Sequence, residues 1–86
     1  MICEVHFSKR AKNQLNHFSK VEVIDILGWL VSNIQGCNDP KALAIPIKGE
    51  NAEYLMYSVD KFNLYCVQDD DIVIVLSVEF NTTSSE

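Results

Sequence analysis

The sequence has little of what marks several large classes of protein. Its 86 residues include one arginine, three cysteines and no apolar run long enough to span a membrane. A transmembrane helix needs about 20 predominantly apolar residues, so no membrane association is predicted. The first residues also lack the basic start and apolar block of a secretory signal, and we expect a cytoplasmic protein.

The cysteines and acidic residues do not form a pattern typical of metal sites. Cys3, Cys37 and Cys66 are odd in number, widely spaced and form no CxxC pair. Cys3 and Cys66 fall within apolar strand patterns, where a thiol acts as a small buried hydrophobe. The three carboxylates at residues 69–71 share one tight turn, which spreads them poorly around a calcium ion. We therefore predict reduced thiols, no metal and no cofactor.

The chain is short of positive charge, with seven Lys and Arg against 12 Asp and Glu and a net charge of -5. Nucleic-acid binders usually carry a basic surplus because phosphate contacts need Lys and Arg. The balance disfavours direct binding of nucleic acid and favours a protein partner. The exception is a basic cluster of Lys9, Arg10, Lys12 and Lys20, which is either a solvated helix face or a docking point for a negatively charged partner.

What the chain does contain is enough apolar material for one globular domain. Hydrophobic residues make up 48% of it, which is typical of a folded protein. A chain of this length has room for one domain only. We predict a single domain over residues 1–80 and a polar, disordered tail over residues 81–86.

The N-terminal half predicts a strand followed by two helices. Apolar and polar residues alternate over residues 2–7, as in a half-buried strand. Ser8 can cap a short first helix, and Ser19 starts the spacing of a capping box. The second helix is expected to run to about residue 35, with Gly36 ending it. We expect this helix to be deeply packed through Val23, Ile24, Ile26, Leu27, Leu30, Val31 and Ile34.

The C-terminal half predicts a meander of strands over residues 54–80. Tight turns are expected at residues 60–61 and 68–71, and a short edge strand interrupted by Pro46 precedes the meander. Residues 72–76 are apolar on both faces, as in a central strand. The predicted fold is α+β, with an N-terminal strand and a helical hairpin packed on a twisted antiparallel sheet.

Three segments carry a family resemblance. Residues 47–49 read Ile-Lys-Gly, residues 62–67 read Phe-Asn-Leu-Tyr-Cys-Val, and residues 69–76 form an acidic turn and an apolar strand. Together with residues 5–8 of the opening strand, they resemble the RelE/ParE superfamily of small bacterial toxins. The resemblance implies a RelE/ParE-like fold and a cognate antitoxin. It also implies the family's targets, which are mRNA on the ribosome for the RelE type and DNA gyrase for the ParE type.

The sequence departs from the family where its RNA-cutting members carry their chemistry. Those members place an arginine in the penultimate strand, where this chain has Asn63, which cannot neutralise the charge that develops on a phosphate. They also carry Arg, His or Tyr after the last strand, where this chain has residues 79–81, Glu-Phe-Asn. Of the family's typical cations, only Lys48 remains in place.

Three functional hypotheses follow. The leading one is a diverged RelE/ParE-like protein that binds a macromolecular target and does not cleave RNA. The second is a ribosome-dependent endoribonuclease with a site built around Lys48, Tyr54 and Tyr65. The third is an inhibitor, immunity or antitoxin-like protein whose acidic surface docks on a basic partner. No catalytic residue is assigned, and the candidate contact residues are Lys9, Arg10, Lys12, Lys48, Tyr54, Asn63 and Tyr65.

The candidate side chains also have plainer interpretations. Lys48 is then a solvated lysine beside a turn, and the tyrosines are partners in cross-strand packing. The two histidines, His6 and His17, are expected on the polar side of the first strand and the outer side of the first helix. A catalytic pair would need a third, orienting group, which the sequence does not indicate.

Overall fold

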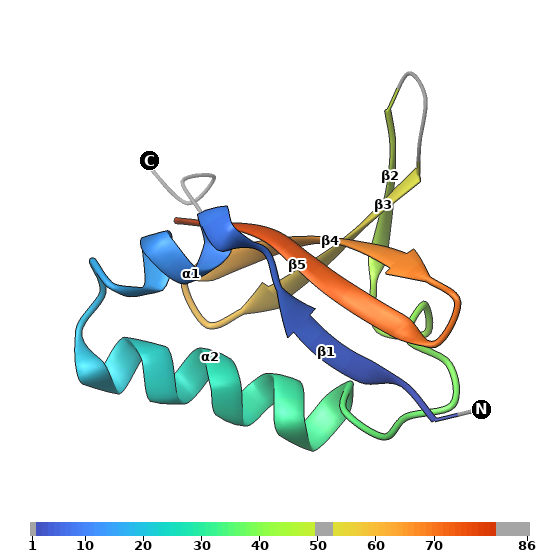
Figure 1. Ribbon diagram of the computed structural model, residues 1–86, viewed down its shortest axis with the longest axis horizontal. Helices are drawn as coiled ribbons and strands as arrows, with labels where there is room; N and C mark the ends of the chain where they lie inside the picture. Colours follow the sequence, from blue (N-terminus) through green and yellow to red (C-terminus); the bar gives the residue numbers. More distant parts are fainter. Residues whose placement is uncertain (1, 50–52, 81–86) are drawn as a thin grey trace.

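The computed structural model describes residues 2–49 and 53–80, and it confirms an α+β fold. Five strands form one sheet, and both helices lie on the same face of it (Figure 1). In the part of the chain that is described, neither helix is long and apolar enough to cross a membrane. The predicted tail over residues 81–86 lies outside the described residues.

The sheet is mixed, which the sequence did not predict. The strands are β1 (Glu4–Phe7), β2 (Ile45–Lys48), β3 (Glu53–Val59), β4 (Phe62–Asp69) and β5 (Ile72–Phe80), and the helices are α1 (Lys9–Leu15) and α2 (Lys20–Asn33). Their order in the sheet is β1-β5-β4-β3-β2. β2 to β5 form the expected antiparallel meander, whereas β1 pairs with β5 in parallel. The chain returns to the sheet through both helices and not through a hairpin, a connection that permits the parallel pairing.

Both helices begin at the serines predicted to cap them. The Ser8 Oγ accepts a hydrogen bond from the Ala11 N–H at 3.1 Å. Ser19 and Glu22 form a complete capping box, with hydrogen bonds of 3.2 and 2.9 Å between each side chain and the other's N–H. Beyond the end of α2, Gly36 adopts a φ of 81°, a left-handed conformation that strains any residue with a Cβ.

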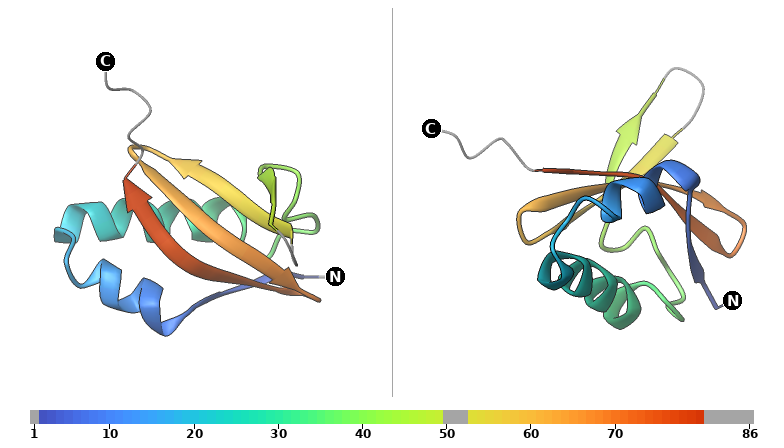
Figure 2. Two further views of the ribbon diagram at one scale, coloured as in Figure 1. Left: turned by 90° about the horizontal axis from the view of Figure 1, so that it is seen from above. Right: turned by 60° about the vertical axis from the view of Figure 1, so that its left-hand side comes forward.

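α2 buries a narrower face than the sequence suggested. Ile26 and Leu30 are buried against the sheet, whereas the side chains of Ile24 and Val31 are 59% and 65% exposed. The expectation of a deeply packed helix is therefore wrong. Its cause is the two-layer architecture, because the sheet covers only one side of α2 and α1 is too short to cover another (Figure 2).

The core lies between the helices and the sheet. Its strand residues are Leu55, Tyr57, Val59, Phe62, Leu64, Cys66, Val73, Val75 and Val78. A bulge opposite Tyr65 and Cys66 inserts Leu76 into β5, which shifts the alternation so that Val75 and Val78 both face inward. The Tyr57 hydroxyl donates a hydrogen bond to the Pro40 carbonyl and so ties the connection before β2 to the sheet.

Candidate functional site

α1 covers the edge of β5 where β1 ends. The pairing of β1 with β5 stops at Phe7 and Val75. Beyond it, the Ser8 Oγ donates a hydrogen bond to the Leu76 carbonyl at 2.9 Å, and the Gln14 Oε1 accepts one from the Val78 N–H at 2.7 Å. These side chains replace the ladder hydrogen bonds that a neighbouring strand would make, so α1 is fixed against the C-terminal half of β5 (Figure 1).

A groove of about 530 Å³ lies between α1 and the end of β5. We call it the α1–β5 groove. Its lining residues are Arg10, Asn13, Gln14, His17, Phe18, Val78, Glu79 and Phe80. The volume lies within the range of pockets that hold small ligands or the anchoring side chains of a partner.

Aromatic rings form the apolar part of this groove. The Phe18 and Phe80 ring centroids are 5.6 Å apart, and each ring lies 5.0 Å from that of buried Phe62. Phe80 is nevertheless 51% exposed, so the cluster presents apolar surface to an incoming group. Aromatic rings in such a setting contribute large contact area, and they favour edge-to-face packing with another aromatic ring.

Two opposite charges flank the aromatic rings. Arg10 is exposed and forms no ion pair with any other described residue. On the facing strand, the Glu79 carboxylate is held by the Gln14 Nε2, which donates a long hydrogen bond of 3.4 Å. With no carboxylate paired to it among the described residues, the guanidinium can bind a carboxylate of a partner through two parallel hydrogen bonds.

The second candidate surface is the side of the sheet that faces away from the helices. Strand register places on it Ile45, Ile47, Tyr54, Met56, Ser58, Asn63, Tyr65, Val67, Asp69, Ile72, Ile74, Ser77 and Glu79, with Glu4 and His6 from β1. We call it the open face. Its charged strand residues are three carboxylates and a histidine, and no described strand residue on it is Lys or Arg. Such a surface repels phosphate groups.

The structure divides the predicted contact residues between these surfaces. Tyr54, Asn63 and Tyr65 lie half-buried on the open face. Lys48 pairs with Glu53 at the end of β2 and, by strand alternation, belongs to the opposite side. On α1, Lys9, Arg10 and Lys12 are exposed, and of these three only Arg10 lines the α1–β5 groove.

The side chain of Asn63 is neutral, and the residue lies beside a carboxylate of the neighbouring strand. It pairs with Ser58 on β3 and with Glu79 on β5. Its Oδ1 atom is buried and has no hydrogen-bond partner among the described residues. An amide next to a carboxylate cannot stabilise the transition state of phosphodiester cleavage as an arginine would.

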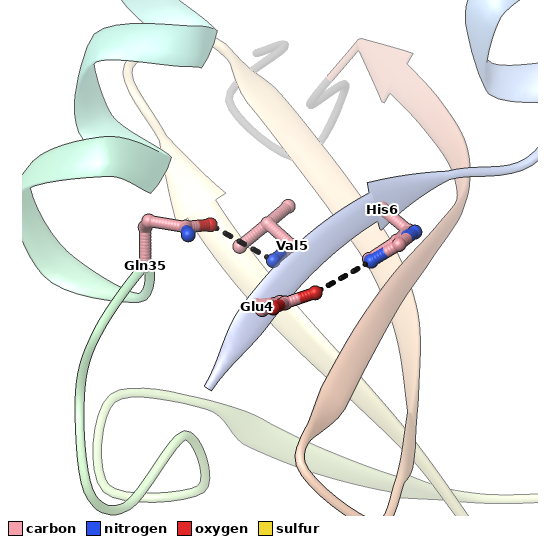
Figure 3. A network of polar contacts seen from close by, with 4 residues as sticks. All are labelled: Glu4, Val5, His6 and Gln35. Carbon is pink, nitrogen blue, oxygen red and sulfur yellow. Dashed lines mark hydrogen bonds and ion pairs between the residues drawn. The ribbon is translucent and has the colours of Figure 1, made fainter. Parts of the chain in front are cut away.

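The structure shows a histidine–carboxylate contact on β1 between two residues that were not among the predicted site residues. The His6 Nε2 lies 3.1 Å from the Glu4 Oε1, and both side chains are more than half exposed (Figure 3). Between them, the Val5 N–H donates a hydrogen bond of 2.9 Å to the Gln35 Oε1, which ties β1 to the chain just after α2. Their spacing of two residues in a strand, which places both on one face, was the available signal.

The His6–Glu4 pair does not complete a nucleophilic site. A histidine base activates a hydroxyl or thiol that lies within hydrogen-bond distance. In the described ranges, no Ser, Thr or Cys side chain is hydrogen-bonded to His6. The arrangement supports a solvated polar contact at the sheet surface, which contributes little to stability.

Comparisons with known proteins bear on the fold. No family model and no curated protein match the chain. Its structure is similar to a chain of the toxin–antitoxin complex RelBE2 from Mycobacterium tuberculosis, with a TM-score of 0.80 and 17% identity over 93% of this chain and 99% of that one. A copper-bound mutant toxin from Helicobacter pylori aligns over 99% of this chain with a TM-score of 0.47, too low to support an argument. At this identity the similarity shows a shared fold alone, which agrees with the RelE/ParE-like fold expected from the sequence.

Proposed function

We propose that the protein is the toxin-like member of a toxin–antitoxin pair and acts in the cytoplasm by binding a macromolecular target, without cleaving RNA. The structural similarity to a chain of a toxin–antitoxin complex supports the pairing. The observation that carries the mechanism is the pairing of Asn63 with Glu79, which sets a neutral amide beside a carboxylate. The family resemblance implies a cation at the position of Asn63 in members that cut RNA. Removing such a cation typically costs a few kcal/mol of transition-state stabilisation.

The open face adds a second electrostatic reason. Its carboxylates, Glu4, Asp69 and Glu79, come from three different strands. RNA that approaches this face would meet negative charge. No described strand residue of the face is a lysine or arginine that could neutralise phosphates and so release the counterions of the RNA. A protein target such as DNA gyrase fits this surface better than ribosomal RNA does, because apolar side chains such as Ile74 and Met56 line it as well.

The α1–β5 groove supports an antitoxin as the partner. Its exposed Phe80 ring and its exposed Arg10 guanidinium suit a peptide that carries an apolar side chain with a carboxylate nearby. A buried apolar anchor surrounded by polar contacts is the usual energetic centre of a protein interface. The antitoxin segment that we propose is therefore amphipathic and acidic on the side that faces Arg10.

Expression of the protein without its partner tests the proposal. We expect growth arrest that co-expression of the neighbouring small gene relieves, with no new mRNA 5′ ends in the arrested cells. Arg10→Glu is expected to weaken binding of the partner, and Lys12→Glu, on the same helix but outside the groove, serves as its matched control. New mRNA ends that disappear in Lys48→Ala cells would overturn the non-cleaving mechanism in favour of the endoribonuclease.

A second candidate, an inhibitor or immunity-type protein, is favoured by the acidic balance of -5. Complementary charge accelerates docking on a basic toxin or nuclease. The same expression experiment separates the two functions. A toxin arrests growth when produced alone, whereas an inhibitor is harmless alone and rescues cells from its partner.

A further inference from the structure

Two cysteines that are far apart in the sequence meet where α2 ends. The chain reverses over residues 34–37, and the Cys37 N–H donates a hydrogen bond of 3.0 Å to the Ile34 carbonyl. Gly36 occupies the third position of this turn with its left-handed φ of 81°. The turn places Cys37 next to the segment that leads into β1.

Cys3 lies opposite both Gly36 and Cys37. The Gly36 N–H donates to the Cys3 carbonyl at 2.8 Å, and the Cys3 N–H donates to the Cys37 carbonyl at 3.1 Å. In a β-bulge, two residues of one strand lie opposite a single residue of the other, and the first of the two can be a glycine with a left-handed backbone. The bulge sets the backbones of Cys3 and Cys37 side by side.

This spacing suits a disulfide bond. Residues that exchange both hydrogen bonds across an antiparallel ladder have Cα atoms about 5.5 Å apart, and disulfides span about 4.4–6.8 Å between Cα atoms. Cys3 exchanges one such bond with Cys37 and the other with its neighbour Gly36. Both thiols are free, Cys3 fully buried and Cys37 partly exposed. Burial, followed by the neighbouring Cys37 thiol, raises the pKa of the Cys3 thiol, which agrees with side chains in mutual contact.

We propose that Cys3 and Cys37 form a redox-active dithiol that closes to an intramolecular disulfide by exchange with a low-molecular-weight disulfide such as oxidised glutathione. The accessible Cys37 thiolate attacks one glutathione sulfur, which forms a mixed disulfide and releases one glutathione. Cys3 then loses its proton and attacks the Cys37 sulfur, which releases the second glutathione. Two protein thiols are oxidised, one glutathione disulfide is reduced, and the two protons pass to the released glutathione thiolates.

Closing this bond would staple the start of β1 to the end of the helical segment. The loop from residue 3 to residue 37 contains both helices. Cross-linking its ends restricts the unfolded chain, so the oxidised protein should be the more stable form. Cys66 offers an internal comparison, because it is buried on β4, where burial raises its thiol pKa to about 12.

The test is equilibration of the reduced protein with oxidised glutathione, followed by alkylation in denaturant, intact-mass measurement and peptide mapping. We expect a monomer lighter by two hydrogens, one alkylated thiol at Cys66 and a linked peptide pair containing Cys3 and Cys37. The melting temperature should rise by roughly 10 °C or more on oxidation. Dithiothreitol should reverse both changes.

Two variants make the outcome decisive. Cys66→Val should oxidise as the wild type does, and Cys37→Ser should neither form the linked peptide pair nor gain melting temperature. The proposal is overturned if wild-type protein keeps three alkylatable thiols or stops at a glutathione adduct. It is equally overturned if the disulfide involves Cys66 or a second chain, or if oxidation fails to raise the melting temperature.

Discussion

Replacement of Gln14 by alanine should loosen α1 from the sheet at a cost that the structure allows us to estimate. The Gln14 Oε1 is 2.7 Å from the Val78 nitrogen, and Val78 is only 2% exposed. Leaving a buried N–H without a partner costs roughly 1–3 kcal/mol. Water in the adjoining α1–β5 groove can reach part of the vacated space, so we expect about 1–2 kcal/mol.

The second hydrogen bond of Gln14 adds little to this figure. The contact of its Nε2 with Glu79 is long, at 3.4 Å, and exposed. A loss of about 1–2 kcal/mol in a domain of this size lowers the melting temperature by roughly 5–15 °C. Urea unfolding gives the free energy directly, and hydrogen exchange reports on the Val78 amide, whose protection should fall.

Two further variants isolate the cause. Gln14→Met keeps the side-chain volume and removes the acceptor, so it should cost about as much as Gln14→Ala. Asn13→Ala alters a neighbouring groove residue that does not bond the strand, and it should stay within about 0.5 kcal/mol of wild type. Equal stability of Gln14→Ala and Asn13→Ala, with an unchanged protection of the Val78 amide, would refute the role of this hydrogen bond.

Three other perturbations have defined outcomes. Gly36→Ala should lower the free energy of unfolding in urea by about 1–2 kcal/mol, because alanine is strained at a φ of 81°. Its Cβ would meet no atom within 4 Å, so the backbone strain acts alone. An unchanged urea midpoint would contradict this expectation. Ser19→Ala should lower the free energy of unfolding by about 1 kcal/mol, because it removes the cap of α2. The control Lys20→Ala should not lower it by this amount. The hydrogen bond from the Ser19 N–H, and then Lys61 at 3.0 Å, hold the pKa of Glu22 below its ordinary value. That contribution is present above the ordinary pKa of a glutamate and is lost as the pH falls through the lowered one, so wild type should lose stability on acidification more steeply than Glu22→Gln.

Local features of the fold could be predicted because their causes are close in sequence. The Ser19–Glu22 capping box and the turn at Gly36 depend on residues within one helical turn, and both are confirmed. The alternation of β3 and β4 likewise reports their buried faces directly. Such signals do not depend on the rest of the chain.

The parts that the sequence did not predict depend on distant residues. The parallel pairing of β1 with β5 joins Val5 to Val73, and nothing in either strand specifies direction. The hydrogen bond between Gln14 and Val78 and the backbone hydrogen bond between Cys3 and Cys37 form only after the sheet has formed. The exposure of Ile24 was not predicted, because apolar periodicity indicates which face of a helix can be buried and not whether another layer of the fold covers that face.

The most direct test of the central claim measures mRNA cleavage on translating ribosomes that are supplied with the purified protein. Because Asn63 is neutral and lies beside the Glu79 carboxylate, we expect the same mRNA fragments with and without the protein. Fragments that depend on the protein, and that vanish with Lys48→Ala or Tyr65→Phe, would contradict it.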